Sequence, residues 1–152
     1  MLRRAFFGLT LAVLASLVAP TPAVRAQDPA QAELKLSSAQ VRKAVIALID
    51  AQLQAFRAHD LKKAYSLAAP ALRAQVPMAQ FVNIVKSGYP EVWANQSATY
   101  GIVRSSDERA TVDVKVKGAD GSASYDYILL KGIDGWRVGG VLRHVLQPDT
   151  AL

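Results

Sequence analysis

The sequence contains no cysteine and only two histidines, His59 and His144. The absence of thiols excludes disulfide bonds, thiolate nucleophiles, iron–sulfur clusters and cysteine-bound zinc or lipid. With so few imidazoles, a metal site would depend on carboxylates, and we predict neither a metal nor another cofactor. The sequence also lacks a known catalytic motif, so its residues do not state an activity directly.

The sequence is poor in aromatic residues (7%) and moderate in charge (20%), whereas 51% of its 152 residues are apolar. An intrinsically disordered chain is less apolar and carries more net charge. The length suits one domain rather than two. The composition therefore predicts a single globular domain.

No hydrophobic run is long enough to form a transmembrane helix. The longest run covers residues 5–19 and is followed by prolines, whereas a bilayer requires roughly 20 apolar residues. It follows the basic pair Arg3-Arg4, and small residues occupy the cleavage positions before Gln27. We predict a signal peptide over residues 1–26, cleaved after Ala26, no membrane span after cleavage, and a periplasmic or secreted protein. An uncleaved N-terminal anchor is the alternative, and the pattern leaves the general and twin-arginine export routes open.

The signal peptide accounts for half of the net charge. Residues 1–26 hold three of the 18 basic residues and none of the acidic ones, so cleavage lowers the formal charge from +6 to +3. The remaining lysines and arginines are scattered, without an arginine-rich helix. We therefore predict no nucleic-acid binding.

The first half of the mature chain has helical patterning. We predict a flexible linker over residues 27–36, a folded domain over 37–146 and a C-terminal tail over 147–152. Ser37 and Gln40 fit a capping box, and apolar residues then recur at helical spacing as far as Phe56. A second helix is expected over 61–67, before Pro70, and a third is expected to begin at Pro77 and end by Pro90.

After Asn95 the spacing of apolar residues changes from a helical period to an alternation of apolar and polar residues. Residues 110–117 alternate apolar with polar side chains, and Asp-Gly pairs at 120–121 and 134–135 are hairpin signals. They predict four strands over 99–105, 109–118, 122–131 and 136–145. Strands joined by tight turns pair antiparallel, so the fold class is α+β, with helices covering one face of a sheet.

The order of these elements resembles the cone-shaped fold of the nuclear-transport-factor-2-like (NTF2-like) superfamily. More specifically, the segments 81–85 and 88–93, the pair Tyr125 and Tyr127, and the closing segment 135–141 resemble the DUF4864 family, which has no assigned function. The resemblance covers residues 37–143. It implies N-terminal helices packed on a curved four-stranded antiparallel sheet, and it assigns no catalytic residue.

Three polar residues are candidates for acid–base chemistry. Asp113 shares its strand face with Lys115, opposite the valines, so we expect it to point to water. Asp126 lies on a strand that is apolar on both faces; it would be a base if it faced the interior of a cone, and otherwise a partner in an ion pair. His144 is an even number of residues from Trp136 and Val138, so it would share their face of the strand. It has no neighbouring nucleophile or ligand motif and is expected to be a surface or capping residue.

The aromatic residues of the domain combine apolar rings with polar groups. They would either fill the core or line a pocket for a small apolar molecule. The possible pocket residues are Tyr65, Tyr89, Trp93, Tyr100, Tyr127 and Trp136.

Three functions are compatible with this sequence. The first is a non-enzymatic exported domain that binds a partner protein or a small apolar ligand in the cell envelope, and that forms a homodimer. The second is an isomerase, dehydratase or hydrolase that uses Asp126 or His144 with a tyrosine inside the cone. The third is an envelope lipid carrier, which requires a large continuous cavity. The lack of a reactive constellation favours the first.

Overall fold

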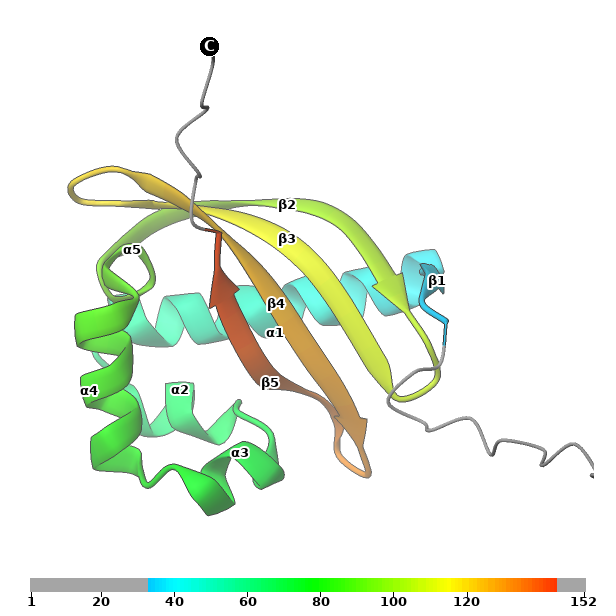
Figure 1. Cartoon of the computed structure of the whole chain (residues 1–152), viewed down its shortest axis with the longest axis horizontal. Coiled ribbons are helices and arrows are strands. Elements are labelled where there is room, and N and C mark those ends of the chain that lie inside the picture. The colour runs from blue at the N-terminus through cyan, green and yellow to red at the C-terminus, as the bar shows by residue number, and fades with distance from the viewer. Residues whose placement is uncertain (1–32, 145–152) are drawn as a thin grey trace, which may run out of the picture.

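A computed structural model describes residues 33–144 of the chain (Figure 1). The predicted signal peptide over 1–26 and the predicted tail over 147–152 lie outside these residues. The helices are α1 (Ala39–Arg57), α2 (Leu61–Ser66), α3 (Pro70–Gln75), α4 (Met78–Gly88) and α5 (Pro90–Trp93). The strands are β1 (Lys35–Leu36), β2 (Asn95–Ser105), β3 (Arg109–Gly118), β4 (Ser122–Gly132) and β5 (Gly135–Arg143).

The strands form one antiparallel sheet in the order β1-β2-β3-β4-β5. The α+β class and the antiparallel meander are therefore confirmed. The predicted number of four strands is wrong, because Lys35 and Leu36 pair with Ser105 and Arg104 and add a fifth strand at the edge. These two residues lie within the predicted linker, and a strand of two residues is too short to show a period.

The helical half differs from the prediction at two points. The N-cap of α1 is Ser38, whose hydroxyl accepts from the Val41 N–H, while Ser37 donates to the Ser105 hydroxyl at 2.7 Å. Pro70 and Pro90, expected only to interrupt helices, each begin one. Proline is favourable at the first helical position because the N–H there has no helical partner to lose.

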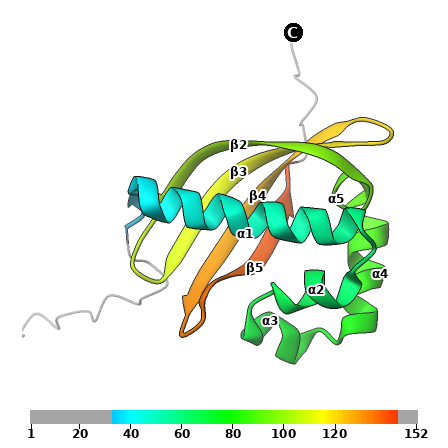
Figure 2. The ribbon, with the colours of Figure 1, turned by 180° about the vertical axis from the view of Figure 1, so that it is seen from behind.

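Helix α1 covers one face of the sheet. The sheet curves over the helix, which crosses the strands (Figures 1 and 2). The apolar stripe of α1 is almost fully buried, as are the alternate residues of β3 and β4 that face it, and no helix among residues 33–144 covers the opposite, outer face. The buried residues of this layer include Val45, Ile49, Leu53, Phe56, Val112, Val114, Val116, Tyr125, Tyr127 and Leu129. Most of the core therefore lies between α1 and the central strands.

Strand β5 contains a bulge that reverses its alternation. Leu129 pairs with Val138 and Ile128 with Gly140, which leaves Gly139 as an extra residue. After the bulge Val141 lies opposite the buried Tyr127, and Leu142 lies opposite Asp126. The prediction that the parity of Trp136 and Val138 continues to His144 is therefore wrong.

Gly118 allows α5 to pack closely on the end of β3. A Cβ at this position would lie 2.9 Å from the Glu91 Cα, a backbone atom that cannot move alone. We expect Gly118→Ala to destabilise the domain by about 1–3 kcal/mol in chemical denaturation. The matched control is Gly88→Ala, where a Cβ meets nothing within 4 Å; it should be neutral or stabilising by up to about 1 kcal/mol. Equal effects of the two substitutions would contradict the close packing of α5.

Candidate functional site

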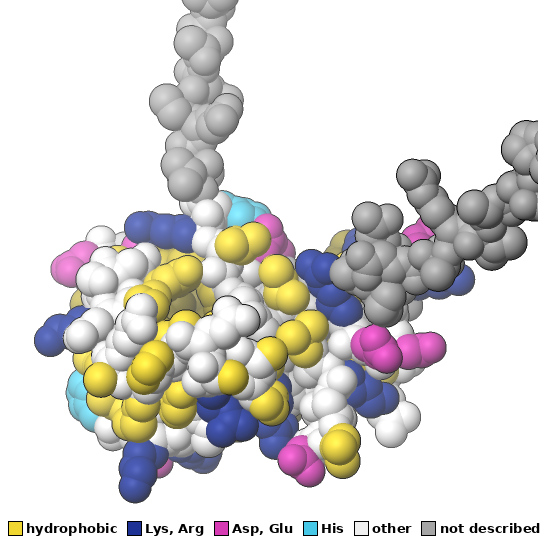
Figure 3. Space-filling model, turned by 60° about the horizontal axis from the view of Figure 1, so that its bottom comes forward, with side chains coloured by type: hydrophobic (Ala, Val, Ile, Leu, Met, Phe, Trp, Pro, Cys, Tyr) yellow, Lys and Arg dark blue, Asp and Glu magenta, His cyan; other side chains and the backbone are white. Residues whose placement is uncertain are grey.

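A pocket of about 280 Å³ opens where the helices meet the edge strand β5. Its walls come from α1, α3, α4, α5, β4 and β5, and hydrophobic side chains surround a hollow on this side of the molecule (Figure 3). The lining residues are Gln52, Phe56, Leu72, Val76, Phe81, Ile84, Val85, Tyr89, Val92, Tyr127, Val138, Gly140, Val141 and Leu142. None of them is charged, so the pocket is suited to an apolar molecule.

Of the six aromatic residues proposed for a pocket, Tyr89 and Tyr127 line it. Tyr65 packs on Phe81 with ring centroids 5.3 Å apart, and Trp93 packs on Phe56 at 6.2 Å. These two residues stabilise the helical layer instead of lining the pocket.

Tyr100 and Trp136 also lie elsewhere. The Tyr100 hydroxyl donates to Asp50 of α1 at 3.4 Å, and burial together with that carboxylate raises the pKa of Tyr100 to about 12. Trp136 is almost buried in β5, beneath the Lys131 ammonium. It borders a shallow groove beside β1, away from α4.

Tyr127 is the one tyrosine whose hydroxyl has no hydrogen-bond partner among residues 33–144. The hydroxyls of the other four donate to carbonyl or carboxylate oxygens. Tyr127 is fully buried in the pocket wall, and burial raises the pKa of its phenol far above the usual value. A buried hydroxyl without a partner costs about 1–3 kcal/mol.

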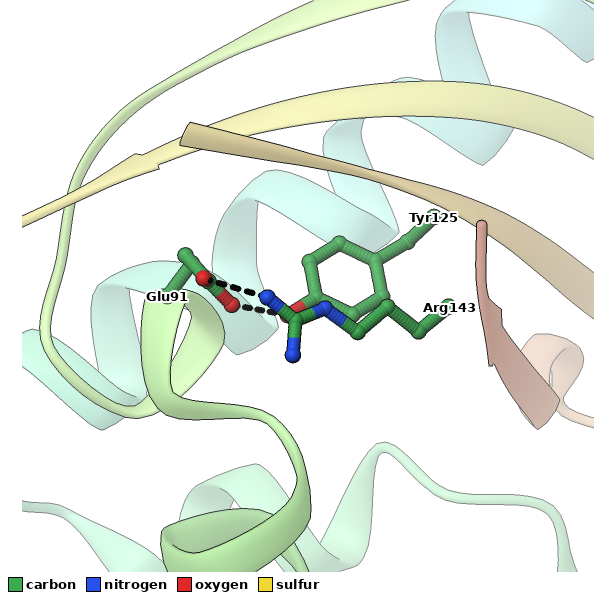
Figure 4. A network of polar contacts seen from close by, with 3 residues as sticks. All are labelled: Glu91, Tyr125 and Arg143. Carbon is green, nitrogen blue, oxygen red and sulfur yellow. Dashed lines mark hydrogen bonds and ion pairs between the residues drawn. The ribbon is translucent and has the colours of Figure 1, made fainter. Parts of the chain in front are cut away.

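A polar network joins α5 to the sheet beside the pocket. Glu91 accepts a short hydrogen bond from the Tyr125 hydroxyl of β4, and the Arg143 guanidinium of β5 pairs with its other oxygen at 2.8 Å (Figure 4). Burial acts to raise the pKa of Glu91, but the Tyr125 hydroxyl, a backbone hydrogen bond and Arg143 together hold it below its usual value. Sequence reasoning did not single out Glu91 or Arg143, because their contact spans 52 residues and has no local signal.

The acid–base candidates meet on the outer face of the sheet. Asp113 and Asp126 are direct cross-strand partners, and His144 pairs with Asp126 at 2.7 Å. Asp113 is exposed, which confirms its predicted orientation. The side chains of Asp126 and His144 are 49% and 41% exposed, so the interior position that the enzyme hypothesis required is wrong for both. The hydrogen bond to Asp126 raises the pKa of His144.

These three side chains are also the group nearest to a metal-binding arrangement in the described part of the chain. One ligand atom from each lies within 4.8 Å of the others. All three are open to solvent to a large extent, and the imidazole is engaged by Asp126. Exposed acidic groups are common without a bound ion, so the arrangement by itself does not assign a metal site.

Comparison with known protein families shows which family the chain belongs to. The model of a domain of unknown function, DUF4864, matches residues 23–150. The chain belongs to this family. No curated protein matches it. Within residues 33–144, no helix of this DUF4864 protein combines the length and hydropathy that a membrane crossing needs.

One of the segments that carried the DUF4864 resemblance, residues 88–93, connects the helices to the sheet. The Tyr89 hydroxyl donates to the Val141 carbonyl of β5 at 2.9 Å. Val92 is buried, and Glu91 binds β4 and β5 through the network described above. The segment therefore closes one end of the pocket and positions its β5 wall.

The Glu91 network predicts a pH-dependent stability. Since the folded-state pKa of Glu91 lies below its ordinary value of 4.5, its stabilisation is present above that pH and is lost as the pH falls through the folded-state pKa. Glu91→Gln keeps an acceptor for Tyr125 but removes the charge. We expect it to lower the free energy of unfolding by about 1 kcal/mol at pH 7, and by progressively less below pH 4.5. Thermal unfolding from pH 3 to 7 measures this difference, with exposed Glu108→Gln as the control; a constant deficit would contradict the charge-based role.

The unpartnered Tyr127 hydroxyl predicts a substitution that does not destabilise the free protein. Tyr127→Phe keeps the ring and removes a buried hydroxyl that forms no bond. We expect it to leave the free energy of unfolding unchanged or to raise it by about 1 kcal/mol. Tyr89→Phe, which loses a hydrogen bond to Val141, should lower it by about 1 kcal/mol. Denaturation of both variants measures the contrast, and equal losses would show that the Tyr127 hydroxyl has a structural partner.

Proposed function

We propose that this DUF4864 protein binds a small apolar ligand in the pocket between α4 and β5, without catalysing a reaction. The uncharged pocket of about 280 Å³ carries this proposal. At its mouth Ile84 and Leu142 are 41% and 58% exposed, so the apolar lining continues to the molecular surface. A bound molecule would bury both side chains.

The size of the pocket favours a small molecule over a lipid. A cavity of about 150 Å³ accommodates benzene, so this pocket suits a ligand of roughly a dozen non-hydrogen atoms. A membrane lipid with two acyl chains is several times larger. The lipid-carrier hypothesis is therefore less well supported than binding of a compact ligand.

The lack of carboxylate and imidazole groups in the pocket supports binding without catalysis. Its polar side chains are an amide and two phenols, those of Gln52, Tyr89 and Tyr127. The acidic and imidazole groups that were considered as catalysts lie on the opposite face of the sheet. A reaction in the pocket would have no carboxylate or imidazole to act as a general base.

The proposal also covers the location of the protein, its interaction surface and its superfamily. The predicted signal peptide supports a location in the cell envelope, and the uncovered outer face of the sheet offers a surface for a homodimer or a partner protein. Helices packed on one face of a curved antiparallel meander support membership of the NTF2-like superfamily.

Binding of α-methylstyrene, a purely apolar molecule of nine carbon atoms, tests the proposed function. We expect saturable 1:1 binding with a dissociation constant on the order of 10⁻⁴ M, with amide chemical shifts that change in α4 and β5. Val141→Trp places a large side chain in the pocket and should weaken binding at least about tenfold. Ile102→Trp adds the same bulk at an exposed position of β2 outside the pocket and should leave the affinity unchanged. Absence of saturable binding would overturn the proposal.

A further inference from the structure

The pocket has three polar side chains, and the donors of two are already engaged. The Gln52 amide nitrogen donates to the Ala64 carbonyl at 3.1 Å, and the Tyr89 hydroxyl donates to the Val141 carbonyl at 2.9 Å. The Tyr127 hydroxyl has no partner among residues 33–144. It is therefore the one side-chain donor group in the pocket wall that forms no hydrogen bond within the described residues.

The position of Tyr127 makes this donor selective. The residue is fully buried and its hydroxyl exposes less than 1 Å², so bulk water does not compete for the hydroxyl. A ligand oxygen reaches it from the pocket when the neighbouring side chains of the wall move aside. A hydrogen bond formed there replaces an unsatisfied buried group and gains more than one formed at the surface. Because burial keeps the pKa of the phenol high, the group stays protonated and donates throughout the physiological pH range.

The lining also excludes a charged ligand. It contains no Lys, Arg or His side chain, and the nearby Arg143 guanidinium is paired with Glu91. An anion in the pocket would lose its hydration without gaining a counter-charge, and so would a cation, because the lining contains no Asp or Glu side chain. Both are strongly unfavourable.

From these observations we infer that the ligand is an uncharged carbonyl compound, whose oxygen accepts a hydrogen bond from the Tyr127 hydroxyl while its apolar body fills the pocket. This inference rests on the proposed function and adds the ligand's chemical class. Ketones, aldehydes and esters of about a dozen non-hydrogen atoms belong to this class. Tyr127 is then the residue that determines specificity.

A pair of matched probes tests the inference. Acetophenone and α-methylstyrene have nearly the same shape, but acetophenone has a carbonyl oxygen where α-methylstyrene has a methylene group. Titrations of the purified protein give the ratio of the two dissociation constants, that of α-methylstyrene over that of acetophenone. We expect Tyr127→Phe to lower this ratio about tenfold, because the carbonyl is then buried without a donor. Tyr100→Phe, which removes a tyrosine hydroxyl that lies outside the pocket and binds Asp50, is the matched control and should leave the ratio within about twofold of the wild-type value.

A spectroscopic measurement on the wild-type protein needs no variant. A carbonyl that accepts a hydrogen bond has a carbon-13 resonance downfield of the same carbonyl in an apolar solvent. We expect this downfield shift for bound acetophenone relative to acetophenone in cyclohexane. An unshifted resonance would overturn the inference even if Tyr127→Phe failed to fold.

Benzoate, which carries a negative charge at pH 7, tests the exclusion of anions. We expect it to bind at least about tenfold more weakly than acetophenone. Tighter binding of benzoate would overturn the uncharged class. An equal probe ratio in wild type and Tyr127→Phe would overturn the role of Tyr127 and leave the proposed function standing, whereas no saturable binding of either neutral probe would overturn both.

Discussion

Burial of a single face of the sheet under α1 is the constraint on which the other features of the structure depend. In a strand, successive side chains point to opposite faces, so one covered face divides β3 and β4 into buried and solvated sets. The valines of β3 and both tyrosines of β4 lie beneath α1. The same alternation sends Asp113 and Asp126 to the outer face, where they meet His144. The sheet itself thus separates the acidic and imidazole groups of its outer face from the apolar core and pocket on its other face.

The pocket forms at the edge of this arrangement, where the cover supplied by the helices is incomplete. Helix α1 lies over the central strands, while the shorter helices reach β5 from the side and leave space between α4 and the strand. The bulge at Gly139 turns Val141 toward this space and Leu142 to its mouth. Because Glu91 binds both Tyr125 and Arg143, the α5 end of the pocket is held against the sheet.

Parts of the fold were predictable because their signals are local. The alternation over 109–118 and the Asp-Gly turns located β3 and the hairpins. The missed elements, β1, α3 and α5, are a two-residue strand, a six-residue helix and a four-residue helix, which are too short to show a period. Of the six aromatic residues considered for a pocket, sequence reasoning could not separate Tyr89 and Tyr127 from the rest, because all six have the same amphipathic character.

The sequence by itself determined most of the secondary structure, the α+β class and the face of β3 that is buried, because these depend on spacings of a few residues. The tertiary structure decided which groups meet. The ion pair of Glu91 with Arg143 joins residues 52 positions apart, and the extra residue at Gly139 reverses the parity of everything after it in β5. Whether a buried hydroxyl finds a partner depends on the packing of every neighbouring element. For that reason, only the folded chain distinguishes Tyr127 from the other four tyrosines.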